Sequence, residues 1–171
     1  MPKLKTILDL FINVFRSFPF IILMILVFPL SRFIVGTTIG STATIVPLSI
    51  AAAPFVARLI EGAIKEVDGG LIELSKSLGA NNWEIIFKVL IPEAMPSLVH
   101  SFTITIISLI GYSAMAGAIG GGGLGDLAIR YGYQRFQTDI MRISVVVIII
   151  IVQVIQVIGD LIVKNIKKNR K

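Results

Sequence analysis

The sequence contains no cysteine and a single histidine among its 171 residues. The absence of cysteine excludes disulfides and thiolate-bound metals, and it removes the thiols from which a redox compartment could be read. One histidine, His100, cannot form a metal site alone. A Walker A sequence is also absent, so the chain has no P-loop with which to bind and hydrolyse ATP. We expect no metal, no cofactor and no covalent chemistry in this chain.

Charged residues are scarce as well, at 15% of the chain, whereas hydrophobic residues make up 55% and the mean hydropathy is +0.90. This composition excludes an ordinary soluble domain. Because a helix needs roughly 20 residues to cross the hydrocarbon layer, the long uncharged stretches predict membrane spans. We expect an all-α integral membrane protein, with a single domain over residues 1–171. Its four transmembrane helices are predicted at 17–35, 43–60, 97–119 and 143–163.

The net charge of +6 is distributed unevenly along the chain. Twelve of the sixteen lysines and arginines precede the first predicted helix, lie at the end of the second or between the second and third, or follow the fourth. Basic residues accumulate on the cytoplasmic side of membrane proteins, so both termini are predicted to be cytoplasmic. The charge is therefore a topology signal rather than a nucleic-acid signal, and the basic tail, residues 164–171, is also suited to contact membrane lipid.

The second predicted helix contains two prolines, Pro47 and Pro54. Each lacks a backbone N–H, so neighbouring helices or water must satisfy the carbonyls that are freed. Such a helix either lines a path or is a kinked packing helix, and the sequence leaves both interpretations open.

The longest polar segment between two predicted spans is residues 61–96, on the positively charged side. Within it, Leu71–Leu78 has the apolar spacing of a short helix, and Gly79 is typical of a helix C-terminus. Asn82 is predicted to cap a second short helix, Trp83–Leu90, which should end before the proline that follows. We expect two short helices on the cytoplasmic side.

Trp83 is the only tryptophan of the chain and stands at the polar start of this second helix. A large aromatic residue in such a place is suited to anchor a partner protein. The alternative is an interfacial residue that enters the lipid headgroups. Residue chemistry alone leaves both open.

The same segment resembles the signature loop of ABC-importer permeases. The stretch Glu73-Leu74-Ser75-Lys76-Ser77-Leu78-Gly79-Ala80, then Phe87, Val89, Ile91 and Pro92, matches the family pattern of Glu-Ala-Ala, three residues, Gly, nine residues, Ile-x-Leu-Pro. The departures are Leu74-Ser75 for the two alanines, and Val89 and Ile91 near the end. The resemblance implies a coupling helix that binds a cytoplasmic ABC ATPase subunit. The residues it assigns to this coupling are Glu73, Gly79, Ala80, Asn82, Trp83, Phe87 and Pro92.

Other motifs resemble the methionine-importer permeases. They are Phe15–Phe20, Ile45–Leu48, Ala52–Arg58, Gly111–Gly117, Gly122–Asp126 and Tyr131–Tyr133. This resemblance implies the ABC type I importer permease fold, a homodimer in the bacterial inner membrane, and delivery of substrate by an extracytoplasmic binding protein. Those permeases usually have five spans, and the first has no counterpart among the four predicted here, which leaves a truncated fragment as an alternative.

The glycine-rich segment 120–142 is predicted to form an outer loop. Its Gly120–Gly125 run formally matches a dinucleotide-binding pattern, but it follows a membrane helix rather than a strand, so we reject that function. We expect instead a loop that the binding protein contacts, or a tight helix end. The candidate docking residues are Arg130, Tyr131 and Tyr133, with Arg135 and Phe136 beside them.

Small residues recur on the third predicted helix, where Ser113, Gly117 and Gly121 are four residues apart. Such stripes allow helices to approach closely, at a dimer seam or within one subunit. A lining of the translocation path by Thr103, Ser113 and Met115 is the alternative, with the flexible thioether of Met115 as a gate. The sequence does not decide between them.

The combined interpretation is a permease subunit of an ATP-driven ABC importer for methionine, with no enzymatic activity of its own. A permease for another small amino acid is the alternative, because only resemblance points to methionine. A stand-alone carrier or channel would need intramembrane charges or a selectivity constriction, and the sequence predicts neither.

Overall fold

The computed structural model describes residues 2–168, and every regular element in that range is a helix. The elements in chain order are α1 (Pro2–Ser17), α2 (Phe20–Val35), α3 (Ser41–Lys65), α4 (Gly69–Ser77), α5 (Asn82–Glu84), the π-helix η1 (Ile85–Leu90), α6 (Ile91–Gly117), α7 (Gly123–Asp126), the π-helix η2 (Leu127–Tyr133) and α8 (Thr138–Lys168). The expected all-α class is confirmed. The end of the basic tail, residues 169–171, lies outside the described residues.

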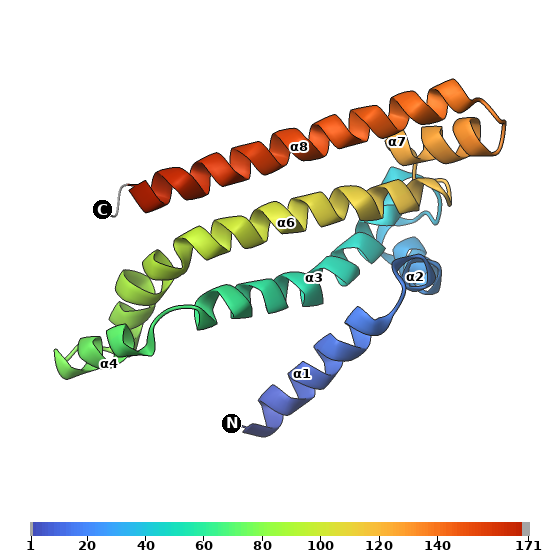
Figure 1. Ribbon diagram of the computed structural model, residues 1–171. Coiled ribbons are helices and arrows are strands. Elements are labelled where there is room, and N and C mark those ends of the chain that lie inside the picture. The colour runs from blue at the N-terminus through green and yellow to red at the C-terminus, as the bar shows by residue number, and fades with distance from the viewer. Residues whose placement is uncertain (1, 169–171) are drawn as a thin grey trace.

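Three long helices form the body of the molecule. α6 packs against α3 on one side and α8 on the other, and the three run lengthwise across the view in Figure 1. α1 lies beside the second half of α3, and α2 is seen nearly end-on (Figure 1). The start of α1 and the end of α8 lie toward the side of the molecule that carries α4.

The apolar helices differ in whether they are long enough to cross a membrane. By length and composition, three described helices can cross a membrane: α3, the continuous helix Asn82–Gly117 and α8. α2 has only 16 residues, or roughly 24 Å at the helical rise, against a hydrocarbon core of about 30 Å. Each of the four predicted stretches thus contains an apolar helix. α3 continues past residue 60 to Lys65, and α6 begins at Ile91 rather than near 97.

The turn between α2 and α3 is set by glycines. α2 ends at Gly36, whose φ of 83° is a left-handed conformation, and α3 begins after Gly40, with φ 97°. Glycine adopts such angles without strain because it has no Cβ. The reversal brings Leu23 and Val27 of α2 against Val46 of α3, which form the apolar core of this half.

The prolines of α3 face the interior. Pro47 is fully buried and Pro54 is buried too, so neighbouring side chains surround both. This burial supports the packing interpretation of the helix at these two positions, rather than a proline-lined path. Kinks at proline are the expected result of the lost backbone hydrogen bonds.

The segment after α6 is more ordered than the predicted outer loop, because it contains α7 and η2. Glycines permit its tight return: a Cβ on Gly117 would lie 2.2 Å from the backbone nitrogen of Asp126, and one on Gly125 would lie 2.2 Å from the carbonyl oxygen of Ala114. The small-residue stripe of α6 therefore serves close packing within one subunit at Gly117. The physical reason is that these helices approach to backbone contact, which only glycine allows.

The surface of α8 is apolar over most of its length. Its buried residues are Ser144 and Gly159, while side chains such as Ile149, Ile150 and Val154 are exposed. A continuous apolar surface of this kind is not stable in water, but it suits hydrocarbon. The arrangement fits a helix that contacts lipid along one side and α6 along the other.

Candidate functional site

The loop between α3 and α6 begins with a well-capped helix. The carboxylate of Asp68 accepts a hydrogen bond from the amide of Gly70 at 2.8 Å, which caps α4 at its N-terminus. At the other end, the amide of Ala80 donates to the carbonyl of Ser75 and that of Gly79 to the carbonyl of Lys76. This pair of bonds is a Schellman motif, and Gly79 has the left-handed φ of +83° that it requires. The predicted role of Gly79 as a helix terminator is confirmed.

The cap of the second loop helix differs from the prediction. Asn81, not Asn82, is the N-cap: its side chain accepts from the amide of Glu84 at 2.9 Å, and the Glu84 carboxylate accepts from the Asn81 amide at 3.0 Å. This reciprocal pair is a capping box. Asn82 is already the first residue of α5, so the assignment of the cap to it was wrong. The Asn-x-x-Glu spacing was the signal that identifies the cap.

The second loop helix also does not end before Pro92. α5, η1 and α6 form one continuous helix, Asn82–Gly117, so the predicted end at Leu90 was wrong. Pro92 stands in the first turn of α6, where the missing N–H of proline is tolerated. Just before it, η1 has the wider π hydrogen bonding, in which the amide of Ile91 donates to the carbonyl of Ile86.

This loop exposes an apolar surface that we call the loop face: Leu74, Leu78, Trp83 and Phe87. Leu78 and Trp83 are 79% and 70% exposed, and the rings of Trp83 and Phe87 stack with centroids 5.9 Å apart. Stacking holds the indole in one orientation at the molecular surface. Exposed aromatic and leucine side chains fixed in this way are typical of a protein-binding surface.

A hollow of about 310 Å³ adjoins the loop face between α4 and η1. It is lined by Ser75, Leu78, Gly79, Ala80, Glu84, Lys88 and Val89. Of the predicted coupling residues, Gly79 and Ala80 therefore lie in this hollow, and Trp83 and Phe87 lie on the loop face. Asn82 and Glu73 are exposed on the same loop, while Pro92 lies at its junction with α6. The structure thus brings the predicted residues to one end of the molecule.

The three predicted path residues are not brought together. Thr103 is buried where α6 packs on α8, and a Cβ on Gly159 would lie 2.2 Å from its hydroxyl oxygen. Ser113 borders a shallow groove of about 420 Å³ between α3 and α6. Met115 borders a different hollow, of about 530 Å³, together with the stacked rings of Phe20 and Tyr112.

The predicted docking residues lie on η2, at the end of the molecule opposite α4 (Figure 1). The guanidinium of Arg130 is paired with Asp126 at 2.9 Å, and that of Arg135 lies over the ring of Tyr131 at 4.6 Å. Tyr133 and Phe136 are strongly exposed. Phe136 has a φ of 57°, an unusual conformation for a residue with a bulky side chain.

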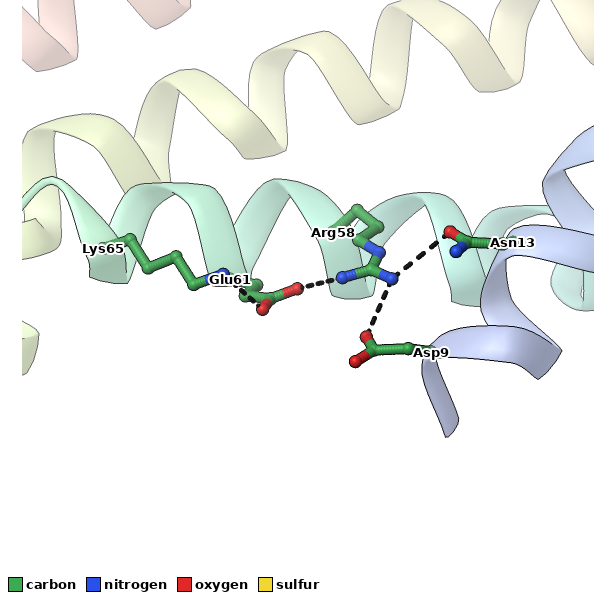
Figure 2. A network of polar contacts seen from close by, with 5 residues as sticks. All are labelled: Asp9, Asn13, Arg58, Glu61 and Lys65. Carbon is green, nitrogen blue, oxygen red and sulfur yellow. Dashed lines mark hydrogen bonds and ion pairs between the residues drawn. The ribbon is translucent and has the colours of Figure 1, made fainter. Parts of the chain in front are cut away.

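A polar network at the α4 end of α3 joins two helices. Figure 2 shows Arg58 paired with Glu61 on its own helix at 2.6 Å and with Asp9 of α1 at 2.8 Å. Asn13 accepts a further bond from the guanidinium at 3.3 Å, and Lys65 pairs with Glu61 at 2.7 Å. The Arg58–Glu61 pair is local, three residues apart on α3. The partners on α1 were missed because no sequence pattern links residues 45 positions apart.

The described residues contain no group of three or more histidine, aspartate or glutamate side chains that could hold a metal ion. Other polar contacts include the bond from Gln156 to Asp160 on α8. The loop face is thus the most developed candidate site, and its chemistry is that of binding a protein partner.

Comparison with known proteins agrees with this geometry. A family described as the binding-protein-dependent transport system inner membrane component matches residues 1–171. The chain is 54% identical over 155 residues to the probable D-methionine transport system permease protein MetI of Vibrio cholerae, covering 91% of this chain and 69% of that protein. It is 52% identical over 157 residues to the methionine import system permease protein MetP of Bacillus subtilis, covering 92% and 71%.

A solved structure is also similar. It is described as an inward-facing conformation of the MetNI methionine ABC transporter, with a TM-score of 0.93, 48% identity, and coverage of 97% of this chain and 77% of the matched chain. This agreement confirms the type I importer fold implied by the resemblance to methionine-importer permeases. Together with the long apolar helices, it makes this a multi-pass membrane protein. The chain belongs to the family of binding-protein-dependent transport system inner membrane components.

Proposed function

We propose that this chain is the membrane-spanning permease subunit of an ATP-driven methionine importer. The observation that carries the proposal is the loop face, built on the Glu73–Gly79–Pro92 spacing and held on two capped helices. The similarity to MetI and MetP supports methionine as the cargo. ATP is hydrolysed by a separate ABC ATPase subunit, since the chain has no Walker A sequence.

The coupling works through the loop face in this proposal. Trp83 and Phe87 enter a groove of the ATPase, while the Schellman turn at Gly79 lets the partner approach the backbone closely. Because the second loop helix continues into α6, movement of the ATPase is transmitted directly to a spanning helix. Glu73, Ala80 and Asn82 complete the contact from the exposed side of the loop.

Two copies of the chain form the translocation path in this proposal. The groove between α3 and α6, which includes Ser49 and Ser113, is the surface where the copies face each other. Met115, which borders the hollow with Phe20 and Tyr112, narrows the path. The burial of Thr103 against α8 favours a packing role for that residue.

The orientation follows the distribution of charge. The α4 end, toward which α1 begins and α8 ends, is cytoplasmic. The η2 end faces the opposite side of the bacterial inner membrane. There the substrate-binding protein docks on Tyr133 and Phe136, with Arg130 and Tyr131 at the edge of the contact.

Labelled methionine uptake in cells that lack the chain tests this function. Uptake should return when the wild-type chain and its ATPase are supplied, and unlabelled methionine should compete better than other small amino acids. Gly79→Val should abolish both uptake and co-purification of the ATPase, because valine is strained at a φ of +83°. Gly69→Val is the matched control in the same loop, since that glycine is in open space without a positive φ. Normal complex formation by Gly79→Val would overturn the coupling assignment.

A further inference from the structure

α1 presents two polar side chains to α3 and apolar side chains to its surroundings. Asp9 and Asn13 point toward α3, where they meet Arg58 (Figure 2). Ile7 and Leu10 face away from the molecule and are 64% and 65% exposed. At these positions α1 turns polar side chains toward α3 and apolar side chains away from the protein, where they form a surface suited to lipid.

A single guanidinium, that of Arg58, contacts the polar groups of both α1 and α3. One terminal nitrogen of Arg58 donates to Glu61, and the other donates to Asp9 and Asn13. The side chains of Arg58 and Asp9 are 24% and 36% exposed in the chain alone. Partly buried charges of this kind are satisfied by one another. The planar fork of arginine makes two such contacts at once, which a lysine ammonium does not reproduce.

The position of this network links it to the loop. Arg58 lies about two turns before the end of α3 at Lys65, and α4 of the loop follows after three residues. A displacement of the loop by a partner therefore reaches Arg58 through a short, continuous helix.

We propose that Arg58 is a positioning residue that clamps α1 to α3, so that both helices move as one body when the loop moves. The clamp consists of Arg58, Asp9, Asn13 and Glu61. The proposal rests on the proposed function only in assigning the loop movement to the ATPase. Without the clamp, α1 stays behind in the lipid while α3 follows the loop.

Distance measurements on the purified protein test the clamp directly. The absence of cysteine means that spin labels attach only at introduced sites, such as Leu10→Cys on α1 and Ala53→Cys on α3, both exposed positions. In lipid nanodiscs with the ATPase bound, the unmodified clamp should give one narrow distance distribution, with and without a non-hydrolysable ATP analogue. Arg58→Gln should broaden it and make it shift on ATP binding, and Arg58→Lys should restore it only in part.

Two controls separate positioning from general stability. Val27→Ala weakens the α2–α3 core at a site remote from the clamp, so it should lower the melting temperature and leave the distance distribution narrow. The charge exchange Asp9→Arg with Arg58→Glu should narrow the distribution again, because it restores an ion pair between the helices. Equal broadening by Val27→Ala, or a narrow distribution in Arg58→Gln, would overturn the clamp.

Transport adds an independent readout. Arg58→Gln should keep the ATPase bound and hydrolysing ATP, since the loop face is unchanged, while methionine uptake per ATP falls roughly tenfold, within the range typical of coupling between sites. If the wild-type chain imports no methionine, the proposed function fails and the distances still decide the clamp. If uptake per ATP is normal while the distances broaden, the clamp does not serve coupling, and that part of the proposal fails.

Discussion

Replacing Gly159 by alanine tests how closely α6 and α8 pack. The added Cβ would lie 2.2 Å from Oγ1, 2.6 Å from Cγ2 and 2.9 Å from Cβ of Thr103. Rotation of the threonine side chain moves its oxygen and methyl group but leaves its Cβ in place. Carbon atoms in contact prefer about 3.5–4.0 Å, so the helices must separate by at least about 0.6 Å.

The free-energy cost of this separation can be estimated from the effect of overpacking in other proteins. Extra atoms in a well-packed interior destabilise by about 1–3 kcal/mol. For a chain of this size, each kcal/mol corresponds to a fall in melting temperature of roughly 2–4 °C. The threonine cannot turn away freely, because its hydroxyl donates to the carbonyl of Val99 at 2.9 Å. We expect Gly159→Ala to lower the melting temperature of the purified permease by roughly 2–12 °C.

The matched control is Gly111→Ala on α6, where an added Cβ meets nothing within 4 Å. It should leave the melting temperature unchanged or raise it slightly, since alanine favours helix over glycine. In the double variant Gly159→Ala with Thr103→Ala, the loss should be partly recovered, by about 0.5–3 kcal/mol of coupling for residues in contact. Strictly additive effects would refute the contact. Thr103 would then be available for the path that the sequence also suggested.

Three further changes test the loop and the dimer. Asn81→Ala removes the capping box and should cost about 1 kcal/mol, seen as weaker ATPase binding in co-purification, whereas Asn82→Ala leaves the cap intact and should weaken binding less, through the loss of its own contact alone. Trp83→Ala should weaken ATPase binding by about 30-fold or more, measured by titration in detergent, because hot-spot residues contribute about 2 kcal/mol or more; unchanged affinity would place the indole in lipid. Ser113→Cys should give an oxidative crosslink between two copies, and Val154→Cys on the lipid side of α8 should not, so the reverse result would relocate the dimer surface.

The sequence predicted the elements that depend on local rules. Apolar length identified the helices, and the position of Gly79 thirteen residues before Pro92 identified the loop. The Schellman turn agrees because its requirement, a residue tolerant of positive φ, is visible as a glycine. A local conformational requirement can be predicted from sequence when one residue type meets it almost exclusively.

Choices between neighbouring residues were harder to predict. Asn81 and Asn82 have the same capping chemistry, and only the position of Glu84 three residues after Asn81 distinguishes them. Pro92 was read as a stop signal, although a proline in the first turn of a helix is compatible with continuation. The π turn that precedes it has no residue signature of its own.

Contacts between distant segments could not be predicted at all. Asp9 is a single charge before the first predicted span until α1 is placed beside α3, where it meets Arg58. In the same way, Gly159 looks like any glycine in an apolar helix until Thr103 is found against it. Such pairings depend on the three-dimensional arrangement of the helices, which cannot be predicted from the residue pattern of a single sequence.

The continuity of the second loop helix with α6 changes how the loop must act. A loop joined by a flexible linker would absorb the motion of its partner, but Trp83 is on the same continuous helix as Ser113, which borders the groove between α3 and α6. That helix has 36 residues, or roughly 54 Å at the helical rise, so a small rotation at the loop face becomes a larger displacement at the far end. The first loop helix, α4, connects instead to α3, which packs along α6. A partner that holds both loop helices therefore acts on the two walls of the same groove at once.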